Sequence, residues 1–369
     1  MKGWPVTNPD NGIVYTSGLT VYFQSARAGW DARLGARLAD FIARTQQRLD
    51  VAIYDLRDNG VLSALKAAAD RGVQLRLLYD AGPAHHGGPV ADPKPGTTGR
   101  AINDAGLGPF AIPYPEHSSR LMHNKFLVRD ASAVWTGSAN FTGGGLTLQD
   151  NNCLTIDSTE LAADYTAEFE ALCAAAVPRQ SLAARPPLAV GSVGVAPLFA
   201  PQAGEGIEDA IIAALNGATR VRMAAFLMSD PGILQALAAL NKAGADLAGV
   251  YDPGGMADAR RGSHQDPALF WFVGDPRFAA APSHPYRPGA EQDFMHNKVL
   301  VIDSGTVVTG SYNFSEHAEA NAENTLILTG DGVAHAYEAY IDALLATYSA
   351  NIPATPGVPE PPGIPHGAG

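Results

Sequence analysis

The chain has 369 residues, a formal net charge of −12 and 46% hydrophobic residues. Its length allows two domains or one large pseudo-symmetric unit with a sizeable core. The acidic total argues against a dedicated binder of long polyanions, which usually has a basic surface, and no apolar run reaches the roughly 18 residues that a membrane span needs.

Strands alternate with helices along the whole chain. In the first half, residues 19–23 are predicted as a strand, 34–47 as a helix, 51–54 as a short strand, 61–70 as a helix closed by Arg71-Gly72, and 73–79 as a strand. The second half has a predicted helix over 207–215, a strand over 221–226, a helix over 233–243 and a strand over 247–251. This alternation predicts an α/β layered fold.

The chain contains an internal duplication. The tetrapeptide Met-His-Asn-Lys occurs at 122–125 and again at 295–298, and Tyr-Asp occurs at 79–80 and at 251–252. A third landmark, Gly-Ser-x-Asn-Phe, occurs at 137–141 and at 310–314. Three landmarks in one order and nearly one register predict a tandem repeat.

Composition sets the boundaries of the two repeats. We predict a first half over 14–177, a Pro-, Ala- and Gly-rich linker over 178–194, a second half over 195–352 and a flexible Pro/Gly-rich tail over 353–369. Two polar stretches, 81–100 and 253–287, break the α/β rhythm and are predicted as loops that cover a site.

Each half carries a His-x-Lys pair with an Asp five residues after the lysine. The residues are His123, Lys125 and Asp130 in the first half, and His296, Lys298 and Asp303 in the second. Apolar residues follow each lysine, which is typical of a strand, and on a strand positions i and i+2 share one face. Lysine suits the charge of a phosphodiester under attack, while one imidazole can attack phosphorus and another can protonate the leaving alkoxide. The pattern therefore predicts phosphodiester chemistry.

A Gly-Ser-x-Asn block begins seven residues beyond each of these Asp residues. The combined pattern resembles the phospholipase D superfamily, whose signature is HxKxxxxD followed by GSxN. The resemblance covers both halves and implies two pseudo-twofold-related halves, each a mixed β-sheet flanked by helices. It also implies a phosphodiester hydrolase that forms a covalent phospho-histidine. No metal or other cofactor is expected, because the two lysines supply the positive charge. One monomer is expected to be sufficient, because the duplication already brings both motifs together.

The resemblance assigns roles to individual residues. The GSxN residues Ser138, Asn140, Ser311 and Asn313 are expected to donate hydrogen bonds to the phosphoryl oxygens of the substrate. In the family a carboxylate near the position of Asp150 and Glu323 binds a catalytic histidine. These two residues follow Asn140 and Asn313 by the same offset.

A carboxylate beside each histidine would not separate the two roles. The N-terminal motif usually supplies the nucleophile in this family. We therefore expect His123, oriented by Asp150, to attack, and His296, paired with Glu323, to act as the general acid. Asp130 and Asp303 either orient a site residue or close the turn after the strand, and the second interpretation is favoured.

Four functions are compatible with these motifs. A phospholipase D that removes phospholipid headgroups, with transphosphatidylation as a further reaction and peripheral membrane contact, is favoured. A nuclease that cuts DNA or RNA is the alternative, disfavoured because Arg260-Arg261 is the only adjacent basic pair. A cardiolipin-type synthase and a non-enzymatic binder are less favoured. The first residues lack a signal-peptide pattern, so a soluble protein is expected, either cytoplasmic or secreted with its signal removed.

Several other residues have open interpretations. His85-His86, His264, His284 and His317 are expected to be solvated loop residues rather than metal ligands. The aromatic run at 269–273 is either a buried short element or a lipid-facing patch. Cys153 and Cys173 are either separate core residues or a disulfide. Tyr54, Phe226, Tyr79 and Tyr251 either pack in the core or flank the substrate.

Overall fold

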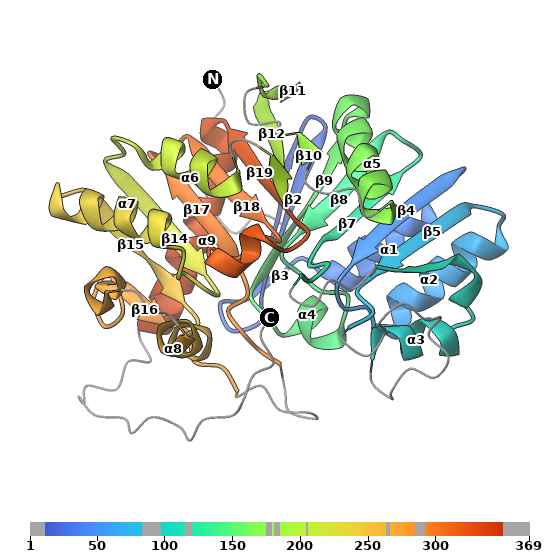
Figure 1. Cartoon of the computed structure of the whole chain (residues 1–369), viewed down its shortest axis with the longest axis horizontal. Helices are drawn as coiled ribbons and strands as arrows, with labels where there is room; N and C mark the ends of the chain where they lie inside the picture. The colour runs from blue at the N-terminus through green and yellow to red at the C-terminus, as the bar shows by residue number, and fades with distance from the viewer. Residues whose placement is uncertain are drawn as a thin grey trace.

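A computed structural model describes residues 12–82, 97–114, 120–174, 179–180, 185–203, 206–262, 266–284 and 292–349. Two large mixed sheets stand side by side in it, one from each half of the chain, with helices packed against both (Figure 1). The prediction of two α/β halves is therefore confirmed.

The first sheet has the strand order β1-β2-β9-β8-β7-β4-β5-β6, with β3 paired to β2. Its strands are β1 (Ile13–Thr16), β2 (Leu19–Ser25), β3 (Trp30–Asp31), β4 (Arg48–Ile53), β5 (Gln74–Tyr79), β6 (Ala111–Pro113), β7 (Lys125–Arg129), β8 (Ala133–Gly137) and β9 (Asn151–Asp157). Strands β4, β5 and β6 are parallel, and the pairs from β1 to β4 are antiparallel.

The second sheet has the equivalent order β11-β12-β19-β18-β17-β14-β15-β16. Its strands are β11 (Leu188–Val190), β12 (Val193–Ala200), β14 (Arg220–Ala225), β15 (Asp246–Tyr251), β16 (Phe278–Ala280), β17 (Lys298–Ile302), β18 (Thr306–Gly310) and β19 (Glu323–Thr329). A separate parallel pair joins β10 (Arg179–Gln180) to β13 (Gln202–Ala203). The duplicated sequence thus folds into duplicated topology.

Three apolar cores hold these layers together. Helices α1 (Leu34–Ala43) and α2 (Asn59–Asp70) cover one face of the first sheet, and α6 (Ile207–Leu215) and α7 (Pro231–Lys242) cover the equivalent face of the second. The largest core lies between the two sheets and includes α5 (Thr159–Cys173) and α9 (Asp331–Ser349). Burial of this shared core ties the halves into one unit, because its apolar surface is removed from water only when both halves are in place.

Helix starts follow the sequence closely. Asp58 and Asp230 occupy equivalent positions and accept the backbone N–H groups of Val61 and Ile233, which begins α2 and α7. The shorter helices are α3 (Thr98–Asp104), α4 (Gly143–Thr147) and α8 (Pro253–Gly262), and the 3₁₀ turns are η1 (Gly108–Phe110), η2 (Pro267–Phe270) and η3 (Glu316–Glu319). Helices α3 and α8 both lie at the lower side of the view in Figure 1.

Some sequence predictions need correction. The helix predicted to reach residue 47 ends at Ala43, and the stretch 253–287 contains α8, η2 and β16 rather than one loop. The expected linker contains β11 and the start of β12, which belong to the second sheet. Cys153 and Cys173 are free, so the disulfide interpretation is wrong. The predicted tail lies outside the described residues, among which no helix is long and apolar enough to cross a bilayer.

Candidate active site

The two His-x-Lys segments lie where the halves meet. Each lysine begins a strand, β7 or β17, and the residues before it pair with the opposite half. Met122 bridges to Ala322, and the N–H of His123 donates to the Ala322 carbonyl. The second half repeats this pairing toward the first, because Met295 bridges to Asp150. Each His-x-Lys segment is therefore positioned by the chain just before β19 or β9 of the other half.

The two lysines are buried and held alike. Lys125 and Lys298 are 0% and 1% exposed, and each Nζ donates to the carbonyl of the preceding histidine at 2.6 Å. Each ammonium also lies 5.2 Å from an aromatic ring centroid, that of Tyr54 or Phe226. Burial lowers the pKa of Lys125 to about 7, and burial together with the charge of Lys125 lowers the pKa of Lys298 well below its usual value. An anionic phosphate between them would restore both charges.

The two histidines have different partners. Nδ1 of His123 lies 2.8 Å from the Glu323 carboxylate, whereas Nδ1 of His296 lies 3.1 Å from the Asn151 amide oxygen. Asn151 uses its amide N–H groups on Gly145 and Gln149, so its oxygen is the acceptor. With each Nδ1 proton held in this way, Nε2 carries the reactive lone pair. Of these two histidines, only His123 has a carboxylate beside it in the part of the chain that the structure describes.

This pairing corrects the sequence prediction. Asp150 was expected to orient His123, and Glu323 to pair with His296. Instead Glu323 reaches across to His123, and Asn151 is the structural equivalent of Glu323. The reason is a one-residue difference in loop length: Ser138 N–H donates to Asn152, 14 residues on, while Ser311 N–H donates to Asn324, 13 residues on.

Asp150 has a different role in the structure. Its backbone joins the bridge to the second half, with its N–H donating to Phe294 and its carbonyl accepting from His296. Its buried carboxylate accepts the hydroxyl of Tyr348, and burial raises its pKa to about 6. Asp150 therefore fixes the backbone of the second His-x-Lys segment rather than an imidazole ring.

The GSxN serines also differ from their predicted role. Ser138 Oγ donates to Asn151 at 2.7 Å, and Ser311 Oγ donates to Glu323. Both serines are fully buried, and a hydroxyl has one proton, so neither is free to donate to a substrate. The two serines instead position Asn151 and Glu323, the side chains that contact Nδ1 of the two histidines. The preceding glycines are required because a Cβ at Gly137 or Gly310 would lie 2.3 Å from a carbonyl oxygen of the next strand.

Asn140 and Asn313 remain candidates for substrate contact. Both side chains are partly exposed, and each has a buried Oδ1 atom with no hydrogen-bond partner among the described residues. No contact to their Nδ2 groups is seen within the same part of the chain. Their role toward the phosphoryl oxygens stays a prediction.

A buried asparagine network links the two halves and was not predicted. The Asn324 amide donates to Asn124 at 2.8 Å and accepts from Thr136 and Tyr165. The equivalent Asn152 donates to Asn297 at 2.9 Å and accepts from its own pair of hydroxyls, those of Thr309 and Tyr337. The Asn that recurs in both Met-His-Asn-Lys tetrapeptides was the sequence feature that could have indicated this network.

Asp130 and Asp303 lie at the other end of their strands and close hairpin turns. The Asp130 carboxylate accepts the backbone N–H groups of Gln46, Gln47 and Arg48 at 2.7 to 3.0 Å. Asp303 accepts in the same way from the segment before β14, and both residues have positive φ, 51° and 48°. The structure thus gives both carboxylates backbone partners at the end of the strand away from the histidines, which favours the structural interpretation over a catalytic role.

The ionisable groups around His123 influence one another's pKa values. Burial lowers the pKa of His123, and the charges of Lys125, Lys298 and His296 lower it further. Burial raises the pKa of Glu323 to about 8, with both lysines opposing that shift. Burial thus disfavours the charged form of both the histidine and the glutamate, and the site favours a bound anion because two lysines face it.

Comparison with known proteins assigns the family. The family model described as "Cardiolipin synthase, PLD-like domain" matches residues 38–173 and again 211–345. The chain belongs to the phospholipase D superfamily. Each matched segment contains one His-x-Lys motif and one GSxN block, so the superfamily pattern is present twice.

Individual relatives are more distant. A mitochondrial cardiolipin hydrolase of Xenopus tropicalis is 28% identical over 137 residues, covering 37% of this chain and 60% of that protein. The Chlamydomonas reinhardtii protein of the same name is 22% identical, covering 37% and 56%. The chain thus spans just over half the length of these curated relatives.

Among solved structures, a phosphatidylserine synthase of Haemophilus influenzae matches with a TM-score of 0.62, 14% identity and 90% and 88% coverage. At this level of identity the likeness concerns the fold, which both chains keep over nearly their full length.

The aromatic and histidine residues that the sequence left open either flank the two histidines of the site or lie away from it. Tyr54 and Phe226 flank the histidines, with ring centroids 5.0 and 5.1 Å away, while Tyr79 and Tyr251 are buried in the outer cores. His284 pairs with Asp293, and His317 lies in η3. His85, His86 and His264 lie outside the described residues. Across the described ranges, no group of three or more His, Cys, Asp or Glu side chains is arranged to hold a metal ion.

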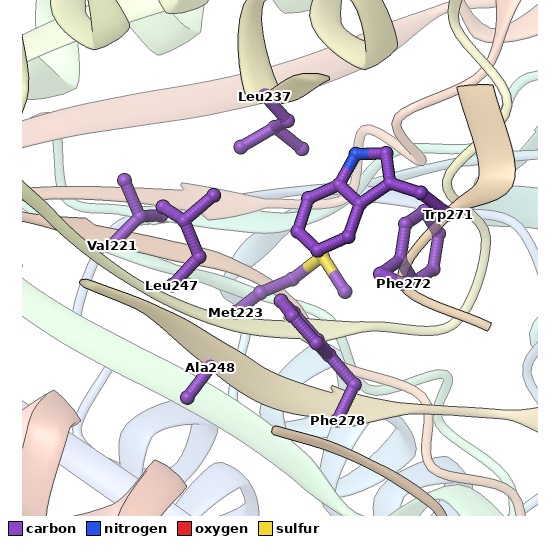
Figure 2. A pocket seen from close by; sticks show the side chains of 8 residues that line it. All are labelled: Val221, Met223, Leu237, Leu247, Ala248, Trp271, Phe272 and Phe278. Carbon is purple, nitrogen blue, oxygen red and sulfur yellow. The ribbon is translucent and has the colours of Figure 1, made fainter. Parts of the chain in front are cut away.

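The aromatic run at 269–273 is part of the core of the second half. Phe270 and Phe272 are 5% and 1% exposed, so the lipid-facing interpretation is wrong. Figure 2 shows a small pocket in which Leu237 of α7 and the Trp271 ring lie above Met223 of β14 and Phe278 of β16. Every side chain that lines the pocket is apolar or aromatic, and none belongs to the two His-x-Lys segments.

Proposed function

We propose that this protein is a phosphodiesterase that acts in two steps through a phospho-histidine on His123. The observation that supports the proposal is the unequal pairing of the two histidines. His123 has the Glu323 carboxylate at 2.8 Å, while His296 has only the neutral Asn151 oxygen at 3.1 Å. A carboxylate that accepts the Nδ1 proton makes Nε2 the better nucleophile and stabilises the positive charge that attack creates on the ring.

In the first step Nε2 of His123 attacks phosphorus, and the bond from phosphorus to one ester oxygen breaks. Protonated His296 gives its Nε2 proton to that oxygen, so the alcohol leaves neutral. The phosphoryl group, still esterified to the other alcohol, stays on His123. Glu323 balances the charge of the substituted ring.

In the second step His296, now neutral, takes a proton from water. The resulting oxygen attacks phosphorus, the phosphorus–nitrogen bond breaks, and His123 leaves with its lone pair restored. The product is a phosphomonoester. An alcohol in place of water gives transphosphatidylation by the same route.

Lys125 and Lys298 stabilise the charge on the phosphoryl oxygens in both steps. They are buried, so they act in a low dielectric where a fixed charge is worth more than in water. Asn140 and Asn313 are proposed to donate to the same oxygens. The lysines supply the positive charge that this chemistry requires, and we propose that the reaction proceeds without a metal.

We propose a phospholipid as the substrate. The curated relatives are named cardiolipin hydrolases, which favours a lipid phosphodiester. Two arginines near the site are already neutralised, because Arg57 pairs with Asp55 and Arg27 pairs with Asp293. Such pairs offer little free positive charge to the backbone of a nucleic acid.

Release of choline from phosphatidylcholine vesicles in excess EDTA tests this function, with plasmid DNA nicking beside it and His123→Ala as the control. Choline release that is lost in the variant supports a metal-independent phospholipase D. Nicking of DNA alone would replace the lipid by a nucleic acid. Loss of both reactions in EDTA and their return with a divalent metal would contradict the metal-free chemistry.

A further inference from the structure

The duplicated Tyr-Asp pair has no part in the reaction steps above, although it recurs in nearly the same register as the His-x-Lys motifs. Tyr79 is the last residue of β5 and Asp80 follows it, and Tyr251 and Asp252 stand in the same way at the end of β15. An aspartate at the same structural position in both halves calls for a role that both halves need.

The central strands β4 and β14 set the level of these residues in the sheets. Ile53 of β4 pairs with Tyr79 on one side and with Lys125 on the other. In the second half Ala225 of β14 pairs in the same way with the last residue of β15 and the first residue of β17. The aspartate that follows each tyrosine therefore lies level with the residues just before the lysine of its own half.

The carboxylate of Asp80 holds the backbone of the first His-x-Lys segment. Its Oδ2 accepts the N–H of Met122 at 2.8 Å, and its Oδ1 accepts the N–H of Gly82 at 2.8 Å. Met122 directly precedes His123 and also bridges to Ala322 of the other half. The residue before the histidine is thus fixed from both halves at once.

Asp252 has the equivalent contacts and is buried more deeply, with 1% of its surface exposed. Its carboxylate accepts the N–H of Gly255 at 2.8 Å and the hydroxyl of Ser283 at 2.9 Å. The N–H of Met295, the residue before His296, also hydrogen-bonds to this carboxylate. Burial raises the pKa of Asp252 to about 6, so the carboxylate is ionised above pH 7.

Both carboxylates also act on the lysine of their own half through their charge. The negative charge of Asp80 raises the pKa of Lys125, and that of Asp252 raises the pKa of Lys298, each against the larger lowering by burial. An ammonium that is buried without a negative partner gives up its proton more easily. Each aspartate therefore opposes the loss of charge that burial imposes on its lysine.

Other ionisable groups face the two lysines, but none of them is repeated in both halves as a carboxylate. These groups are Glu323, Asp55, His123 and His296. The structural equivalent of Glu323 is the neutral Asn151, and Leu227 stands in the second half where Asp55 stands in the first. Within the described part of the chain, the aspartate of the Tyr-Asp pair is the carboxylate that both halves place near their lysine.

We propose that Asp80 and Asp252 are positioning residues that fix the backbone before each histidine and keep the lysine of the same half charged while the site is empty. This inference rests on the proposed function, in which the two lysines stabilise the charge on the phosphoryl oxygens. A lysine that had lost its proton would meet the anion without a charge. The aspartates prepare both lysines without contacting the substrate.

The test measures the affinity for sulfate, which stays a dianion between about pH 7 and 10 and reports the charge of the lysine pair without turnover. Calorimetric titrations across this range give the pH at which the wild-type protein loses affinity as the lysines lose their protons. Asp80→Asn and Asp252→Asn keep one acceptor oxygen and remove the charge. Because the lysine pKa falls when a negative neighbour is removed, each variant is expected to move this alkaline limb about one pH unit lower.

Two further variants separate the charge of the aspartates from their structural contacts. Asp80→Glu keeps the charge, so its limb is expected to stay near the wild-type pH even if the longer side chain weakens binding. Asp130→Asn removes a carboxylate that also accepts backbone N–H groups but lies at the far end of β7, so its limb is expected not to move. Thermal unfolding shows whether each variant is folded, and the partly exposed Asp80 carries the test if Asp252→Asn does not fold.

Hydrolysis of methyl p-nitrophenyl phosphate by the wild-type protein, measured beside sulfate binding, separates this proposal from the proposed function. An alkaline limb that stays at the wild-type pH in the asparagine variants, or that Asp80→Glu moves equally, overturns the role of the aspartates. Hydrolysis by a wild-type protein whose sulfate affinity does not change with pH also overturns that role and keeps the phosphodiesterase. The expected shifts in sulfate affinity without any hydrolysis keep the effect of the aspartates on the lysines and overturn the phosphodiesterase.

Discussion

Replacement of Glu323 by glutamine removes one charge and little volume from the site. In the wild-type protein the buried carboxylate lies 2.8 Å from His123 Nδ1 and also accepts the Ser311 hydroxyl. Glutamine keeps an oxygen and adds an amide N–H, which can turn toward the ring. The neutral amide can no longer balance the positive charge that His123 acquires on attack.

The size of the effect follows from the type of hydrogen bond. A hydrogen bond to a charged group contributes about 1.5–3 kcal/mol, and a tenfold rate change corresponds to about 1.4 kcal/mol. Glu323→Gln is therefore expected to lower kcat by about 10- to 150-fold. KM is expected to change much less, because Glu323 acts through His123 and not on the substrate.

Steady-state hydrolysis of methyl p-nitrophenyl phosphate provides the assay. The matched variant is Asn151→Asp, which places a carboxylate beside His296 instead. A carboxylate there raises the pKa of that imidazole, so the alkaline limb of the kcat profile is expected to move to higher pH. If Glu323→Gln kept its kcat within about threefold of the wild-type value, the assignment of His123 as nucleophile would lose its support.

Three further predictions follow from the same contacts. Asp150→Asn is expected to change kcat by less than about threefold, because its carboxylate contacts Tyr348 rather than His123; a loss as large as that of Glu323→Gln would restore Asp150 as the orienting group. Asp130→Ala removes the acceptor of three backbone N–H groups, so urea unfolding is expected to show a loss of about 1–2 kcal/mol with kcat unchanged. Burial places the pKa of Lys125 at about 7, so kcat/KM is expected to fall as pH rises from 7 to about 9, when the free enzyme loses that positive charge. A flat kcat/KM profile over that range would show that Lys125 stays charged.

Much of the fold was predictable because the sequence repeats. The apolar run after each lysine forms β7 and β17, and the equivalent Asp residues at 58 and 230 begin α2 and α7. The position of Asp130 at the turn after β7 was also predictable, because a residue five positions beyond the lysine lies at the far end of the strand. These features depend on local pattern and strand geometry.

The pairing of the histidines was not predictable from spacing. A constant offset between the repeats makes Asp150 the residue equivalent to Glu323. The loop after the first GSxN block is one residue longer, however, so Asn151 occupies the position equivalent to Glu323 in the structure. The partners also cross between halves, and the bridge from Met122 to Ala322 exists only in the tertiary structure. The serine hydroxyls were misassigned for the same reason, because their acceptors are set by packing.

We propose that a covalent phosphoryl group forms on His123. The most direct measurement mixes the protein with dihexanoyl phosphatidylglycerol, denatures it in alkali within a single turnover, and locates the added mass by peptide mass spectrometry. We expect a substrate-derived phosphoryl adduct on the peptide that contains His123, and none in His123→Ala. An adduct on His296, or turnover with no adduct on either histidine, would contradict it.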